Sequence, residues 1–264
     1  MSDPIASYLL LGFSALVAGA INAIAGGGTL FTFSALLTVV DPVTANATST
    51  VALVPGSLAG AWGYRQELHT TRRWTTLLIG PCVVGGVIGS LLVTELDEQY
   101  FVAIVPWLLL TAALLFLVQP AVARLAGIGK EHRAITPWTL TGIVGFQFIV
   151  AVYGGYFGAG IGILMLSALG LMGFANIHQM NALKTILAAC INGVSVVVFV
   201  AEQKVEWRYA LSMAITAIVG GYLGARIARR LDSNVVRWVV VLIGLGLAAH
   251  FFYQQWRSAH TSGS

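Results

Sequence analysis

The sequence has few charged residues for its length. Lysine, arginine, aspartate and glutamate make up 9% of the 264 residues, whereas 58% are hydrophobic, and the mean hydropathy is +0.86. A soluble domain carries about 25% charged residues, so this chain cannot cover a water-exposed surface. Its apolar stretches are continuous and reach the roughly 20 residues that a membrane-spanning helix needs. Alternating strands of about 10 residues, typical of a membrane β-barrel, are missing. The composition predicts an all-α, multi-pass membrane protein.

Cysteines and catalytic clusters are also scarce. Cys82 and Cys190 are the only cysteines, and both lie in apolar segments, which argues against a disulfide framework. The apolar segments hold no paired carboxylates, no metal-ligand cluster and no nucleophile beside a base. We therefore expect no enzymatic activity, no cofactor and no metal site. The net charge of +4 reflects basic loops, which bear on membrane orientation, so the expected partner is the lipid bilayer and not a nucleic acid.

Eight apolar segments cover most of the chain. No lysine or arginine precedes the first one, so it lacks the basic region of a cleaved signal peptide and is expected to remain in the mature protein. The first and fifth segments exceed 30 residues, which is too long for one span, and each has a glycine cluster near its middle. The segments are residues 7–40, 44–64, 74–94, 98–119, 135–173, 177–200, 207–228 and 235–253.

The second half of the sequence repeats features of the first. The block Asn46-Ala47-Thr48-Ser49-Thr50 corresponds to Asn181-Ala182-Leu183-Lys184-Thr185, 135 positions later, and Gly85–Gly89 corresponds to Gly220–Gly224 at the same offset. Self-similarity of this kind predicts two structural repeats. We assign repeat one to residues 1–120, a basic cytoplasmic connector to 121–135, repeat two to 136–255 and a polar C-terminal tail to 256–264.

The charged loops favour opposite orientations for the two repeats. The basic loop follows the second apolar segment in repeat one, with Arg65, Arg72 and Arg73, but the third segment in repeat two, with Arg226, Arg229, Arg230 and Arg237. Basic loops tend to stay in the cytoplasm, so this change of position predicts inverted repeats. Inversion requires an odd number of crossings, from a re-entrant hairpin plus three spans or from five spans, whereas four spans would leave the repeats parallel. Inverted repeats with broken helices recur in transporters.

The two glycine clusters are the first candidate binding site. Backbone groups that a helix break frees must be buried in protein or line a wet cavity. A helix that starts after the break directs its N–H groups and positive dipole end toward it, which favours an anion. Close helix packing through small residues is the alternative interpretation. The candidates are Gly26, Gly27, Gly28, Thr29, Gly158, Gly160 and Gly162.

Polar residues near the start of the following apolar segment in each repeat are the second candidate. Asn46 and Thr50 share a helix face, and Asn181 and Thr185 keep the same spacing. Their amide and hydroxyl donors suit an oxyanion, as do those of the intervening Thr48 and Ser49. A helix cap would explain only one residue of this block.

Lys184 replaces Ser49 in repeat two, about two turns inside an apolar segment. A lysine at the centre of a membrane helix costs about 2.5–3.5 kcal/mol, and such a residue indicates a functional site by default. An anionic substrate is its expected partner, and snorkelling to the interface is the alternative. His178 is a candidate proton site, or else an interfacial histidine. The remaining polar residues are interpreted as contacts between helices: Asn22, Gln147, Gln179 and Asn192.

The chain resembles the sulfite exporter TauE/SafE family over nearly its whole length. The resemblance rests on the glycine-rich first segment, the block Ala45–Thr50, the run Ser57-Leu58-Ala59-Gly60 and the pair Gly85-Gly86. It implies a two-repeat protein that moves small anions, notably sulfite and organosulfonates, across the bacterial cytoplasmic membrane. The residues that match the family pattern are Gly26, Gly27, Gly28, Thr48 and Ser49, whereas Leu183-Lys184 departs from it and favours a charged substrate.

The residues and the resemblance together predict a secondary transporter that exports small anions by alternating access. The alternatives are an anion or small-solute channel, proton-coupled anion uptake through His178, and a membrane scaffold that transports nothing. A homodimer is compatible with the sequence, which leaves the oligomeric state open.

Overall fold

The computed structural model describes residues 4–24, 26–125, 137–171, 177–227 and 233–261, and every regular element in these ranges is an α-helix. Six helices are long and apolar enough to cross a membrane, namely α1, α5, α6, α7, α9 and α10. The predicted all-α, multi-pass membrane protein is therefore confirmed. The helices are α1 (Pro4–Ile24), α2 (Thr29–Leu36), α3 (Pro42–Gly63), α4 (Arg65–Thr70), α5 (Arg72–Glu95), α6 (Glu98–Leu125), α7 (Pro137–Tyr156), α8 (Ile161–Leu171), α9 (Ile177–Ala201), α10 (Trp207–Ile227) and α11 (Ser233–Thr261).

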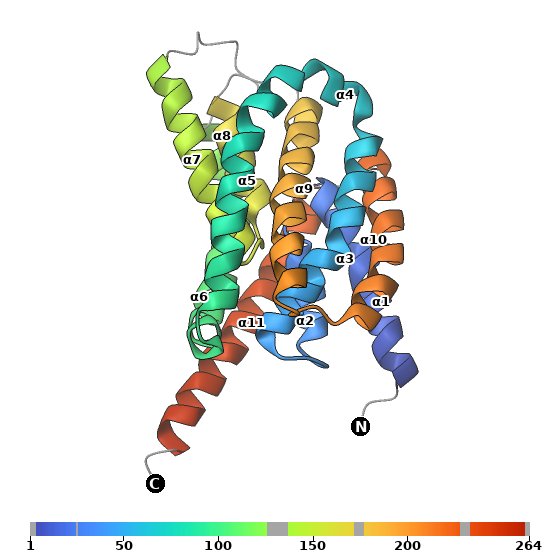
Figure 1. Cartoon of the computed structure of the whole chain (residues 1–264), viewed down its shortest axis with the longest axis vertical. Helices are drawn as coiled ribbons and strands as arrows, with labels where there is room; N and C mark the ends of the chain where they lie inside the picture. Colours follow the sequence, from blue (N-terminus) through green and yellow to red (C-terminus); the bar gives the residue numbers. More distant parts are fainter. Residues whose placement is uncertain (1–3, 25, 126–136, 172–176, 228–232, 262–264) are drawn as a thin grey trace.

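The long helices stand side by side in one bundle (Figure 1). The short helix α4 joins α3 to α5 at one end, which we call the α4 end, and both chain termini lie at the other, which we call the terminal end. α1 runs from the terminal end toward the middle of the bundle, where the chain turns into α2, which packs against α1. α7 starts at the α4 end and also reaches the middle, where the chain turns into α8, which packs against α7.

Glycines mark both turns in the middle of the bundle. α1 ends at Ile24 and α2 begins at Thr29, whereas α7 ends at Tyr156 and α8 begins at Ile161. The backbone φ angle is positive at Gly26 (77°), Gly27 (105°), Gly158 (78°) and Gly160 (80°). Glycine adopts these angles without the steric penalty of a side chain, so each glycine cluster allows the chain to leave one helix and enter the next.

α3 begins at a defined cap. The Asp41 side chain accepts a hydrogen bond of 2.9 Å from the backbone N–H of Thr44, and Pro42 occupies the first helical position, where a missing N–H costs nothing. This start places the polar block of repeat one in the second and third turns of the helix. All four of its candidate residues, Asn46, Thr48, Ser49 and Thr50, are buried.

α10 packs on α1 and α3 with its backbone in direct contact. A Cβ added to Gly220 would lie 2.0 Å from the carbonyl oxygen of Leu16 in α1. A Cβ added to Gly221 would lie 2.0 Å from the carbonyl oxygen of Gly56 in α3. Only glycine fits at these two positions, because any side chain would overlap a neighbouring backbone.

α5 packs on α7 and α9 in the same way. A Cβ added to Gly85 would lie 2.8 Å from the carbonyl oxygen of Phe148 in α7, and one added to Gly86 would lie 3.1 Å from that of Ile191 in α9. α6 and α11 pack on each other, as do α3 and α9. The bundle is therefore held by contacts between helices from both halves of the chain.

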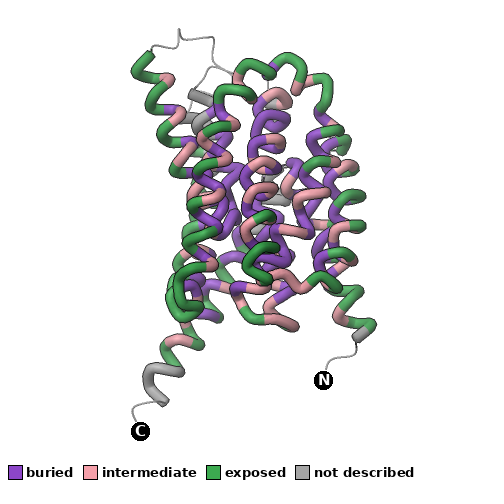
Figure 2. The backbone as a smooth tube through the Cα atoms, viewed as in Figure 1, coloured by how far each residue is buried: buried purple, intermediate pink, exposed green. Residues whose placement is uncertain are grey.

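Buried residues gather inside the bundle and exposed residues outside it (Figure 2). The outside carries many large apolar side chains, among them Trp138 with 88% exposure and Ile5 and Leu9 with 70% each. In water such a surface would be unfavourable, whereas in a membrane it faces hydrocarbon of equal polarity. The distribution of side chains thus agrees with the membrane placement that the composition predicted.

Two of the polar residues interpreted as helix contacts make such contacts. Cys82 and Cys190 are free thiols, as predicted, and the buried Cys82 accepts a hydrogen bond of 3.2 Å from Gln147 Nε2, which joins α5 to α7. Gln179 Nε2 donates to Thr70 Oγ1 at 3.0 Å, which joins α9 to α4.

Two helices extend into ranges that the sequence analysis assigned to polar segments. α6 continues to Leu125, within the assigned connector 121–135, and α11 continues to Thr261, within the assigned tail 256–264. Residues 126–136 lie outside the described part of the chain.

Replacing Gly221 by alanine should destabilise the fold, because the new methyl group would overlap the carbonyl oxygen of Gly56. Overpacking of this kind costs about 1–3 kcal/mol, so the midpoint of thermal unfolding of the detergent-purified protein should fall. Gly193→Ala in α9 is the matched control, because no heavy atom lies within 4 Å of the added Cβ, and its midpoint should stay or rise. An unchanged midpoint for Gly221→Ala would contradict the close contact between α10 and α3.

Candidate functional site

The two glycine turns meet each other in the middle of the bundle. A Cβ added to Gly26 would lie 2.7 Å from the Cα of Gly162, so the backbone of the first turn touches the start of α8. The two segments are separated by more than 130 residues in the sequence. Their contact brings both glycine clusters together, as a single binding site between the two halves of the chain would require.

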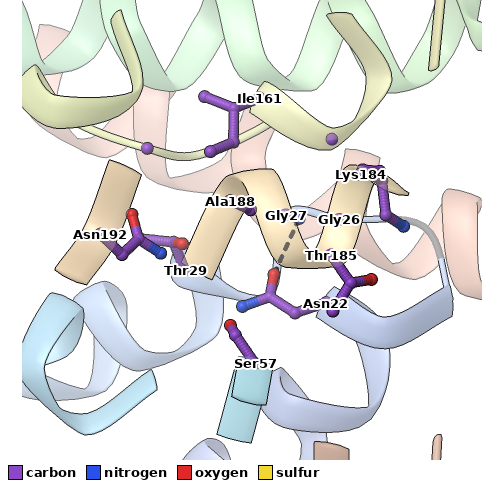
Figure 3. A pocket seen from close by; sticks show the side chains of 12 residues that line it. Asn22, Gly26, Gly27, Thr29, Ser57, Ile161, Lys184, Thr185, Ala188 and Asn192 are labelled. Atoms are coloured by element: carbon purple, nitrogen blue, oxygen red, sulfur yellow. Dashed lines mark hydrogen bonds between the residues drawn. The ribbon is translucent and has the colours of Figure 1, made fainter. Parts of the chain in front are cut away.

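A small cavity lies at this meeting point (Figure 3). The centre of a water molecule has about 20 Å³ to move in, which is room for a water or two in this conformation. Its walls come from α1, α2, α3, α8, α9 and the two turns. The lining residues are Asn22, Gly26, Gly27, Thr29, Ser57, Gly158, Ile161, Gly162, Lys184, Thr185, Ala188 and Asn192.

Asn22 satisfies the backbone of the first turn. Its Oδ1 accepts hydrogen bonds from the N–H groups of Gly27 at 3.1 Å and Gly28 at 2.7 Å. These two N–H groups, which the sequence suggested as anion donors, are therefore engaged within the protein. The same bonds fix the amide, whose nitrogen points away from the glycines in Figure 3 and is left as a donor at the cavity.

Tyr153 holds the second turn. Its hydroxyl donates to the carbonyl oxygen of Ala159 at 2.7 Å, and its own carbonyl accepts the N–H of Gly158 at 3.3 Å. Gly160 lies on the side of α6, where an added Cβ would be 3.5 Å from the Cα of Ala112. Each turn is thus closed by one polar side chain from the helix that precedes it.

The C-terminal ends of α1 and α7 are each capped by a helix of the opposite half. Lys184 Nζ in α9 donates to the carbonyl oxygen of Ile24, the last residue of α1, at 3.4 Å. Asn46 Nδ2 in α3 donates to the carbonyl oxygen of Tyr156, the last residue of α7, at 3.0 Å. Such carbonyls have no partner within their own helix, and the cation of Lys184 also suits the negative dipole end of α1.

Lys184 is the one charged side chain that is buried among the residues whose burial the structure describes, with 1% exposure. Its Nζ also donates to Asn181 Oδ1 at 3.2 Å. No described aspartate or glutamate forms an ion pair with it. Two neutral acceptors satisfy two of the three N–H donors of the ammonium group, so its charge is not neutralised by a described carboxylate.

The hydroxyls of the polar blocks have partners within the protein. Ser49 and Thr32 share a hydrogen bond of 2.5 Å between their Oγ atoms, and Thr48 Oγ1 accepts the N–H of Glu206 at 3.0 Å. Thr50 donates to the carbonyl of Asn46 at 2.9 Å, and Thr185 to that of Asn181 at 2.7 Å. Thr48 and Ser49 therefore tie α3 to the α9–α10 loop and to α2.

The structure brings half of the candidate residues together at the cavity. Those in the lining are Gly26, Gly27, Thr29, Gly158, Gly162, Lys184 and Thr185. The others lie outside the lining, and most of them support it through the bonds described above: Gly28, Asn46, Thr48, Ser49, Thr50, Gly160 and Asn181. His178 is half-buried at the start of α9 and does not line the cavity.

Three polar lining residues were not assigned to the site from the sequence, namely Asn22, Ser57 and Asn192. Asn22 and Asn192 were interpreted as contacts between helices. Ser57 and Asn192 lie 135 positions apart, the offset of the polar blocks. That shared offset is the signal by which the sequence could have singled out this pair.

Comparison with known proteins relates the chain to membrane transporters. A family model described as sulfite exporter TauE/SafE matches residues 11–251. A probable membrane transporter protein of Haemophilus influenzae is 28% identical over 255 residues, which cover 96% of each chain. The probable membrane transporter protein YfcA of Escherichia coli K12 is 28% identical over 252 residues, 94% of this chain and 91% of the relative.

A further relative is less similar in sequence. The probable membrane transporter protein YunE of Bacillus subtilis is 26% identical over 269 residues, covering 91% of this chain and 97% of the relative. The family model spans nearly the whole bundle, including both glycine turns and every residue that lines the cavity. The chain belongs to the sulfite exporter TauE/SafE family of membrane transporters.

Proposed function

We propose that this protein is a secondary transporter that exports small anions, such as sulfite or an organosulfonate, across the bacterial cytoplasmic membrane. The observation that carries the proposal is the buried amine of Lys184 at a cavity between two glycine turns, without a described acidic partner. A buried charge without an opposite charge is costly. An anion in the cavity would reduce that cost, which explains why a charge is kept there.

Neutral donors around the cavity support an oxyanion as the substrate. The amide nitrogens of Asn22 and Asn192 and the hydroxyls of Thr29 and Ser57 all belong to lining residues. Together with the ammonium of Lys184 they could surround several oxygen atoms of one ligand. Charge-assisted hydrogen bonds of this kind are roughly twice as strong as neutral ones.

The helix contacts support two inverted repeats. The helices of repeat one correspond in order to those of repeat two: α1, α2, α3, α5 and α6 to α7, α8, α9, α10 and α11. Under this correspondence, the contact of α1 with α10 matches the contact of α7 with α5. The contact of α3 with α10 likewise matches that of α9 with α5. Two further contacts join corresponding helices of the two repeats, namely α3 with α9 and α6 with α11. In this arrangement α1 and α7, although long enough to span, end in the middle of the bundle and form re-entrant hairpins with α2 and α8. Three further helices of each repeat would cross, which is the odd number of crossings that inversion requires.

The distribution of charge supports a cytoplasmic location for the α4 end. Arg65, Arg72 and Arg73 flank or belong to α4, and Arg226 lies in the last turn of α10, near the same end of the bundle. The loop between α5 and α6 at the terminal end is acidic, with Glu95, Asp97 and Glu98. Basic segments remain on the cytoplasmic side, so both termini would face the outside of the membrane.

Packed side chains lie on either side of the cavity, which supports alternating access rather than a continuous channel. Toward the terminal end, the buried rings of Phe33, Phe101 and Phe157 pack together, with 5.2 Å between the ring centroids of Phe33 and Phe157. Toward the α4 end, Tyr64 donates to the carbonyl oxygen of Ala23 at 3.4 Å. Rocking one repeat against the other would open one closure at a time.

The membrane potential alone could drive export. With the inside negative, moving a monoanion outward gains about 2.3 kcal/mol per 100 mV. A coupling ion is then unnecessary, and the position of His178 outside the cavity lining agrees with uncoupled export.

The orientation can be tested with single cysteines in a Cys82→Ala/Cys190→Ala background. A membrane-impermeant thiol reagent is applied to cells whose cytoplasmic membrane is intact; any outer membrane is permeabilised first. We expect the reagent to label Asp97→Cys and not Arg226→Cys. Both should be labelled after the cytoplasmic membrane is opened. Labelling of both sites in intact cells would refute the inverted arrangement.

Replacing Lys184 by methionine should weaken anion binding by about tenfold or more, because a hydrogen bond to a charged group contributes about 1.5–3 kcal/mol. The measurement is the rise in unfolding midpoint of the purified protein with sulfite, an alkanesulfonate, sulfate or acetate, since a ligand of the folded state stabilises it by mass action. Wild-type protein should respond to sulfite or the sulfonate, and Lys184→Met should lose that response.

Two control variants separate charge from structure in this experiment. Lys204→Met makes the same change in the α9–α10 loop and should respond to the anion like wild type. Tyr64→Phe removes another hydrogen bond at the C-terminal end of α1, so it should lower the unliganded midpoint and keep the ligand-induced rise. An undiminished rise in Lys184→Met would remove Lys184 from the site, and absent counterflow of labelled anion in proteoliposomes would argue against a carrier.

A further inference from the structure

A second cavity lies at the α4 end of the bundle, apart from the glycine turns. It is larger, with about 480 Å³ open to the centre of a water molecule, and it is formed where α3, α4, the start of α5 and α9 come together. Its lining consists of Leu58, Ala61, Trp62, Arg65, Leu68, His69, Arg72 and Ile186. The cavity shares no residue with the anion site, so it calls for a separate explanation.

One side of this cavity is basic. Arg65, the first residue of α4, and Arg72, the first residue of α5, are exposed, and the exposed His69 lies in the last turn of α4. None of the lining residues is acidic. The guanidinium of Arg65 is held at the rim, because it lies 5.7 Å from the ring centroid of Trp62 and donates to the Trp62 carbonyl oxygen at 3.4 Å.

The other side is apolar and continues along α3. Leu58 and Trp62 are one helical turn apart and are 51% and 65% exposed, although both are large apolar side chains. Ile186 of α9 completes this wall. From Trp62 back to Leu58 the wall follows α3 for four residues, about 6 Å, so the cavity joins a basic rim at α4 to an apolar wall that continues along α3 toward the middle of the bundle.

We propose that this cavity binds an anionic phospholipid, with the phosphate at Arg65 and Arg72 and an acyl chain along Leu58, Trp62 and Ile186. Both parts of such a ligand are matched by the lining, whereas a soluble anion would leave the exposed apolar wall unused. Basic pockets between membrane helices on the cytoplasmic side suit anionic lipid headgroups. The site does not depend on the proposed transport, since it requires only the charge and shape of the α4 end.

A lipid in this position would contact both halves of the chain. Leu58 and Trp62 belong to α3 and Arg65 to α4, in the first half of the chain, whereas Ile186 belongs to α9 in the second half. Between α4 and α9, the exposed hydrogen bond from Gln179 to Thr70 lies in the same region. A bound lipid should therefore stabilise the folded protein. Binding can then be measured both as a rise in the unfolding midpoint and as an increase in the mass of the protein.

The test uses full-length protein purified in a neutral detergent, with lipid adducts counted by native mass spectrometry and stability followed by thermal unfolding. We expect phosphatidylglycerol to remain bound and to raise the unfolding midpoint, and phosphatidylcholine to do neither. One basic residue near a phosphate contributes about fivefold in affinity, so the variant Arg65→Gln/Arg72→Gln should bind phosphatidylglycerol about 25-fold more weakly. The two single variants should each show about a fivefold loss.

Arg73→Gln is the matched control, because Arg73 is adjacent and exposed but does not line the cavity. It should retain lipid like wild type. Leu58→Ser, which leaves the contact of Arg65 with Trp62 intact, should reduce lipid retention while leaving the arginines in place. The proposal is overturned if phosphatidylcholine binds equally well, if Arg73→Gln loses as much lipid as the double arginine variant, or if inorganic phosphate stabilises the protein as strongly as phosphatidylglycerol.

Discussion

The whole structure depends on satisfying the backbone groups that are freed where α1 and α7 end inside the bundle. In a membrane these groups find no water, so each must bond within the protein. The chain meets this need with Asn22 and Tyr153 at the turns and with Lys184 and Asn46 at the helix ends. Because both caps at the helix ends cross from one half to the other, ending a helix in mid-bundle also binds the halves together.

These caps can form only because the helices approach each other very closely. The glycines of α5 and α10 allow backbone contact with α7 and α1, and the contact of Gly26 with Gly162 brings the two turns together. A cavity then remains where side chains are too short to fill the space between the turns. The small residues therefore allow the close helix contacts, and the polar cavity lies where the two turns meet.

Several elements followed directly from the sequence. Composition predicted the membrane bundle, and the excessive length of two apolar segments, with glycines near their middles, predicted where the chain would turn. The 135-residue offset paired Ser49 with Lys184 and marked both polar blocks. The blocks are predicted to bind a substrate, and in this structure Thr48 and Ser49 lie outside the cavity lining and bond to Glu206 and Thr32. Their position could not be read from the sequence, because which face of a helix meets a cavity depends on its neighbours.

The sequence by itself determined that this is a multi-pass helical protein of the TauE/SafE type with a lysine inside an apolar segment, because hydrophobicity, glycine clusters and motif spacing are local properties. Only the tertiary structure decided which polar groups meet. It engaged the N–H groups of Gly27 and Gly28 with Asn22, set Lys184 at the end of α1, and added Ser57 and Asn192 to the cavity. Such partners lie far apart in the chain, and packing alone selects them.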